Sequence, residues 1–181
     1  MMNRDIEYFD KCFQSLHTNV QKGSPAPHKA ILLLSIIDLI EDGVISDARI
    51  FLSEELEAKF CKLWKYYLGK SLLFSPDIFK PYYHMDHEPF WELVPIDENQ
   101  SEKIEPRYNR SWIQSNYQYA LIDEELFKLL KDERVRAQFR LSLIGKYLVG
   151  QPIEHSIPAP LVAKKSSVIG KLCSILSLFV A

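Results

Sequence analysis

The densest group of residues that could hold a metal ion or move a proton is the segment His84-Met85-Asp86-His87-Glu88. Two imidazoles and a carboxylate suit a zinc hydrolase when the imidazoles lie on one face of a helix. The surrounding sequence predicts a short strand and a turn, which would point His84 and His87 to opposite faces. Because no separate third ligand is evident, the pattern favours a surface turn with a partly buried His84. We therefore predict no metal and no cofactor.

Motifs for nucleotide binding and nucleophilic catalysis are absent from the sequence. There is no G-x-S-x-G elbow, and the 6 glycines form neither a G-x-G-x-x-G nor a G-x-x-x-x-G-K loop. Cys12, Cys61 and Cys173 lack C-x-x-C spacing, which argues against a disulfide framework and is typical of a reducing compartment. We predict no catalytic residues, although an endonuclease with a metal site at His84 and His87 stays open as a rival.

Three short clusters combine cations with aromatic rings or with a helix start. They are His28-Lys29, Lys80-Pro81-Tyr82-Tyr83-His84 and Arg107-Tyr108-Asn109-Arg110. Cations neutralise phosphates, flat rings contact bases, and the first turn of a helix attracts anions. Such clusters are common, so spacing alone fits solvated helix faces and packed rings at least as well as nucleic-acid binding.

The elements that must position these clusters follow from hydrophobic spacing. Residues 28–42 are apolar on nearly every side, which predicts a central helix covered by others. An extended segment is expected over residues 44–51, and a hairpin of two strands over residues 80–85 and 90–94. The predicted fold is mainly α with a small antiparallel β-hairpin (α+β). The predicted helices span residues 4–21, 28–42, 54–69, 112–119, 124–130 and 133–148.

The charge of the chain is unevenly distributed. Its 181 residues carry a formal net charge of −2. Residues 1–127 hold 13 Lys and Arg against 21 Asp and Glu, whereas the remainder holds 9 against 3. The near-neutral total therefore does not exclude a local nucleic-acid-binding face.

The distribution of apolar residues along the chain predicts its domains and its location. The N-terminus MMNRDIEYFD lacks the apolar core of a signal peptide, and no stretch reaches the roughly 18 apolar residues of a membrane helix. We expect a cytoplasmic protein without membrane contact. Residues 1–150 are predicted to form one domain, and residues 151–181 a partly disordered tail that could instead dock a partner.

Four segments in order make the sequence distinctive: APHKAILLLSIIDLIEDGVI, IFLSEELEAKFCKLWKYYLG, FKPYYHMDHEPFWELVP and YALIDEELFKLLKDERVRAQFRLSLIGKYL. Over residues 9–148 the chain resembles the DNA sulfur-binding domain of modification-dependent bacterial restriction endonucleases of the HNH class. The resemblance implies a winged-helix-like helical domain that binds double-stranded DNA carrying a backbone phosphorothioate. It implies a DNA-binding reader module of a bacterial restriction or defence system.

The resemblance also implies specific site residues. The sulfur pocket would comprise Pro81, Tyr82, Tyr83 and His84, and the DNA-binding residues would be His28, Lys29, Lys80, Arg107 and Arg110. Sulfur is larger and a poorer hydrogen-bond acceptor than oxygen, so an apolar cup discriminates between them. Some members have an aromatic residue in place of Lys80 and a small residue in place of His84. The pocket of this chain is therefore expected to be more polar.

Relatives in this family continue into a nuclease domain with a His-Asn-His metal finger. The only histidine after His87 is His155, so the C-terminal segment supplies no such finger. We expect a reader whose nuclease, if any, is a separate subunit. The alternative is an HNH-family restriction endonuclease, or a fragment of one, whose cleavage is supplied by a missing or separate nuclease domain.

Overall fold

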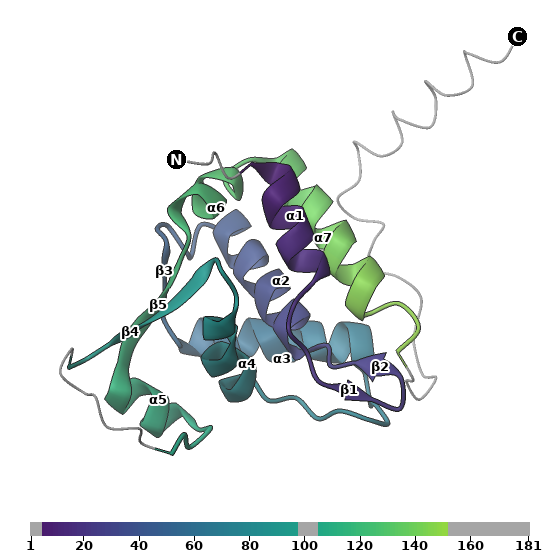
Figure 1. The fold of residues 1–181 in the computed structure, drawn as a ribbon, viewed down its shortest axis with the longest axis horizontal. Helices are drawn as coiled ribbons and strands as arrows, with labels where there is room; N and C mark the ends of the chain where they lie inside the picture. The colour runs from purple at the N-terminus through teal and green to yellow at the C-terminus, as the bar shows by residue number, and fades with distance from the viewer. Residues whose placement is uncertain (1–4, 98–104, 152–181) are drawn as a thin grey trace, which may run out of the picture.

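The computed structural model describes residues 5–97 and 105–151, which form seven α-helices and two small antiparallel sheets (Figure 1). This mixture agrees with the predicted α+β class. Of the predicted tail, only Gln151 lies within the described residues. In this part of the chain, no helix is both long enough and apolar enough to cross a membrane.

The helices are α1 (Ile6–Gln14), α2 (His28–Glu41), α3 (Glu54–Leu68), α4 (Phe79–His84), α5 (Arg110–Asn116), α6 (Glu124–Leu129) and α7 (Glu133–Tyr147), with a 3₁₀ turn, η1 (Met85–His87). The strands are β1 (Val20–Gln21), β2 (Ser24–Pro25), β3 (Arg49–Ile50), β4 (Trp91–Pro95) and β5 (Tyr117–Ile122).

Helix α2 is the centre of the core, which confirms the prediction of a covered central helix. Its buried residues run from Lys29 to Leu39, and α3, α4 and α7 all pack against it. The buried hydroxyl of Ser35 donates to the Ile31 carbonyl oxygen at 2.7 Å, so this polar group is satisfied inside the core. Because neighbours hold α2 on several sides, His28 and Lys29 at its first turn have fixed positions.

Helices α1 and α7 lie side by side, with the ring of Phe13 4.9 Å from that of Phe139 (Figure 1). Helix α1 is shorter than the predicted span 4–21. Beyond it, the Leu16 N–H donates to the Tyr147 hydroxyl at 2.9 Å, and the His17 N–H donates to Glu88 at 2.9 Å. These tertiary partners replace helical carbonyl groups, and the chain leaves the helix axis.

Strands β1 and β2 form a hairpin that the sequence reading did not predict. Lys22 and Gly23 connect them with φ of 49° and 83°. A two-residue turn with positive φ at both positions matches the twist of paired strands, which favours type I′ geometry. The hairpin leads directly into α2.

The larger sheet has the order β3-β5-β4, with β5 antiparallel to both neighbours. Tyr82 of α4 connects two strands of this sheet through its hydroxyl group. The Tyr82 hydroxyl donates to the Ile50 carbonyl at 2.6 Å and accepts from the Ala120 N–H at 3.0 Å. Ile50 and Ala120 are cross-strand partners, so one buried side chain bridges β3 and β5.

The prediction of a strand over residues 80–85 was wrong, since these residues form α4 and the start of η1. Pro81 lies in the first turn of α4, where a backbone N–H has no helical acceptor, so proline is tolerated. The Asp77 carboxylate accepts from the N–H groups of Phe79 at 2.9 Å and Lys80 at 3.3 Å, which secures the helix start.

Two other predictions were partly confirmed. Strand β4 corresponds to predicted residues 90–94, but it pairs with β5 instead of residues 80–85. The helix predicted over 112–119 is divided, because α5 ends at Asn116 and the following residues enter β5.

Candidate functional site

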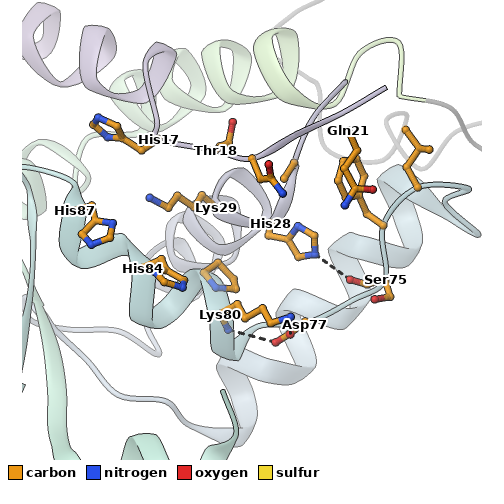
Figure 2. A pocket seen from close by; sticks show the side chains of 15 residues that line it. His17, Thr18, Gln21, His28, Lys29, Ser75, Asp77, Lys80, His84 and His87 are labelled. Carbon is orange, nitrogen blue, oxygen red and sulfur yellow. Dashed lines mark hydrogen bonds and ion pairs between the residues drawn. The ribbon is translucent and has the colours of Figure 1, made fainter. Parts of the chain in front are cut away.

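A cavity of about 500 Å³ lies at the N-terminal end of α2 (Figure 2). Three segments, 17–29, 73–77 and 80–87, supply its lining residues. Residues on either side of the β1–β2 hairpin, together with Gln21 of β1, form one wall, the loop before α4 forms another, and α4 with η1 forms the third. Of the nine predicted site residues, five line this cavity: His28, Lys29, Lys80, Pro81 and His84.

The floor of the cavity contains a buried ion pair. The Lys29 ammonium lies 2.5 Å from Glu88 Oε1, and the two residues are only 6% and 3% exposed. Glu88 also accepts from the His17 N–H, and its Oε2 lies 3.3 Å from His17 Nδ1. One carboxylate therefore joins α2, the segment after α1 and the segment after η1.

The ring of His28 is held from two sides. It lies 4.7 Å from the ring of Trp64 and 5.8 Å from that of Phe74. Its Nε2 is 2.9 Å from the Ser75 carbonyl oxygen, which can only accept, so Nε2 carries a proton. Burial lowers the pKa of the His28 imidazole below its ordinary value, opposed by the Ser75 hydrogen bond and by Asp77.

Helix α4 presents three predicted site residues on one wall. Lys80 extends outward, with its side chain 60% exposed and its ammonium 3.8 Å from Asp77. The rings of His84 and His87 lie 5.7 Å apart, because both positions belong to one helical turn. The expectation that they point to opposite faces was therefore wrong. His84 is partly buried, as predicted.

The polar groups of the cavity adjoin apolar surface. Ala26, Leu73, Phe74 and Pro81 all contribute to the lining, from each of the three segments. The cavity thus offers cationic side chains next to a hydrophobic wall. Such a site suits an anion that carries a weakly hydrated part.

Tyr82 and Tyr83 do not line the cavity. Tyr82 is buried under the sheet, and burial raises the pKa of its hydroxyl far above the ordinary value. Tyr83 belongs to an aromatic cluster with Tyr108, Trp112 and Tyr117. In this cluster, burial together with Tyr83 raises the pKa of Tyr117 to about 12.

The two predicted arginines are also outside the cavity lining. Arg107 is exposed and precedes Tyr108, whose hydroxyl lies 3.1 Å from His84 Nε2, so this segment reaches the cavity rim. Arg110 instead donates to the Leu52 carbonyl at 2.9 Å and pairs with Glu57 of α3. Its guanidinium is committed to holding α5 against α3.

Sequence reasoning did not assign His17 or Gln21 to the site, and it named Glu88 only in a candidate metal cluster, not as the partner of Lys29. His17 and Gln21 line the cavity, and Glu88 neutralises Lys29. The Lys22-Gly23 pair was the available signal for a hairpin that would present Gln21. The ion pair of Glu88 had no local signal, because its partner is 59 residues away.

In the part of the chain that the structure describes, no group of three or more His, Cys, Asp or Glu side chains is arranged to hold a metal ion. Comparison with protein-family models gives no match, and no curated protein matches the sequence. The site must therefore be interpreted from its own geometry.

Proposed function

We propose that this chain is a DNA-binding reader module of a bacterial restriction or defence system, acting in the cytoplasm on double-stranded DNA that carries a phosphorothioate. The observation that carries the proposal is the convergence of His28, Lys29, Lys80, Pro81 and His84 on one cavity. These residues come from two segments about fifty positions apart, and all five belong to the set of site residues that the sequence resemblance implies.

The chemistry of the cavity supports an anionic ligand with an apolar edge. A phosphorothioate keeps the negative charge of the phosphate, and its sulfur is more polarisable and less strongly hydrated than oxygen. We assign the sulfur to the surface of Pro81, Ala26 and Phe74, and the charged oxygens to Lys80 and the first turn of α2.

The arrangement of elements around the cavity supports a winged-helix-like mode of binding. The β1–β2 hairpin stands beside the N-terminus of α2, where a wing would flank a helix on DNA. Gln21 on this hairpin is exposed and lines the cavity, so polar side chains face the proposed ligand from both elements.

A binding titration tests this proposal directly. Two duplexes of identical sequence, one with a single phosphorothioate and one with ordinary phosphate, are compared at several salt concentrations. We expect tighter binding of the phosphorothioate duplex, and affinity that falls with a log–log slope of about 0.9 per neutralised phosphate. Equal, salt-insensitive binding in the millimolar range would overturn the proposal. The two sulfur diastereomers are tested separately, because a fitted pocket distinguishes them.

A further inference from the structure

All four histidines within the described residues line the same cavity. They come from separate places: His17 follows α1, His28 begins α2, His84 ends α4 and His87 lies in η1. Figure 2 shows Lys29 between His17 on one side and His84 and His87 on the other. Four imidazoles from three separate segments, with His84 and His87 on one helical turn, therefore meet around one open space.

The permanent charges around this space cancel. Lys29 is paired with Glu88, and Lys80 lies 3.8 Å from Asp77. Two cations and two carboxylates leave the cavity without net charge when its histidines are neutral. Its attraction for an anion is therefore controlled by imidazole protonation, which occurs near pH 6.5 for an unperturbed side chain.

The histidines face different charged groups. His17 Nδ1 faces Glu88, so a positive charge on His17 would be balanced inside the protein. His28 is half-buried, with Asp77 and Lys80 as its charged neighbours. His84 faces His87, Lys29 and Lys80, and its Nε2 contacts the Tyr108 hydroxyl. A bound anion would therefore stabilise a positive charge on the His84–His87 pair more than on His17 or His28.

An anion in the cavity and a proton on this pair stabilise each other. Burial, followed by His87, Lys29 and Lys80, lowers the pKa of His84 in the free protein. The negative charge of a phosphate oxygen beside the pair opposes the effects of His87, Lys29 and Lys80 on the pKa of His84, whereas the effect of burial remains. The pKa of His84 is therefore higher in the complex than in the free protein, and anion binding takes up protons.

We propose that DNA binding in this cavity is coupled to proton uptake by His84, whose ring lies 5.7 Å from that of His87, so that affinity increases as the pH falls from 7.5 to 5.5. This inference rests on the proposed function. It adds regulation to the site, because a small decrease in pH would increase the affinity of the protein for DNA.

The test measures fluorescence anisotropy with both duplexes between pH 5.5 and 8 at constant ionic strength. We expect an affinity gain on the order of tenfold from pH 7.5 to 5.5. Calorimetry at pH 6.5, in two buffers of different ionisation enthalpy, should report an uptake of roughly one proton per complex. Circular dichroism at each pH verifies that the protein remains folded.

Histidine variants identify which side chains take up the protons. The change His84→Gln with His87→Gln should flatten the pH dependence, whereas His155→Gln should retain it. Each single variant is measured as well, in case the double variant does not fold. Binding that is independent of pH and takes up no protons would overturn this inference alone. Pronounced pH dependence that survives in the His84 and His87 variants would also overturn it. Absence of DNA binding at every pH would overturn the proposed function and this inference together.

Discussion

The ammonium group of Lys29 lies 2.5 Å from Glu88 Oε1, and both side chains are almost completely excluded from solvent. The lysine that the sequence marks as a DNA-binding residue therefore has an internal partner. Its charge is compensated in the free protein, and its main measurable effect there is on the assembly of the cavity floor. The buried, paired Lys29 therefore has a structural role in the free protein, whereas the exposed Lys80 is available for a ligand.

Removing one member of the pair should destabilise the protein strongly. Glu88→Gln leaves a buried ammonium without its carboxylate, and Lys29→Met leaves the reverse, so each is expected to cost about 3–5 kcal/mol. The double variant should cost clearly less than the sum of the two. Urea unfolding of all four proteins measures the coupling. Additive losses would contradict the pairing.

Tyr82→Phe should lower stability by about 1–3 kcal/mol, because it leaves the Ile50 carbonyl and the Ala120 N–H without the hydroxyl that joins them. Thermal unfolding should reveal a lower midpoint. Tyr66→Phe is the matched control, since Tyr66 is 44% exposed on α3. Equal effects of the two substitutions would argue against the bridging role of Tyr82.

Lys80→Gln should weaken DNA binding and reduce the salt slope by about 1, because an exposed cation at the cavity rim is expected to neutralise one phosphate. Lys11→Gln is the control, since Lys11 is also exposed and paired within its own helix, with Glu7. The same decrease for Lys11 would show that the effect arises from overall charge, and not from the cavity.

Mild acid should reduce the stability of the free protein before any carboxylate is protonated. Burial lowers the pKa of His28 and His84 in the folded state. The unfolded chain therefore binds protons first, and the free energy of unfolding falls as the pH drops below about 6.5. The loss ends below the folded-state pKa values. Unfolding curves from pH 7.5 to 5 measure it, and a stability independent of pH over this range would contradict the burial of these imidazoles.

The long helices could be predicted from sequence because their signals are local. In the structure the Ser53 side chain accepts from the Leu56 N–H, and the Asp123 side chain accepts from the N–H groups of Glu125 and Leu126 at the start of α6. Strand β5 was missed because its partner strands β3 and β4 are both distant in sequence and no short turn connects either of them to it. Helix α4 was mistaken for a strand because proline and tyrosine resemble edge-strand residues, whereas Asp77 secures a helix start.

The site could be predicted only where its residues lie close together in the sequence. His28 with Lys29, and Lys80 with Pro81 and His84, are short clusters in the sequence, and the structure brings both clusters to one cavity. Tyr82 could not be assigned to the core from its own neighbours, because its hydroxyl partners come from two distant strands. Arg110 was equally ambiguous, since its role depends on Glu57.

The wall that carries His17 is held by residues that are translated well after it. The Leu16 N–H is fixed by Tyr147, 131 positions further along, and the His17 N–H by Glu88, 71 positions further along. A nascent chain from which α7 has not yet emerged lacks the Tyr147 anchor, although Glu88 is already present. The cavity wall beside His17 is therefore completed only after α7 has been made, and a chain truncated before α7 would lack the Tyr147 hydroxyl that holds this wall.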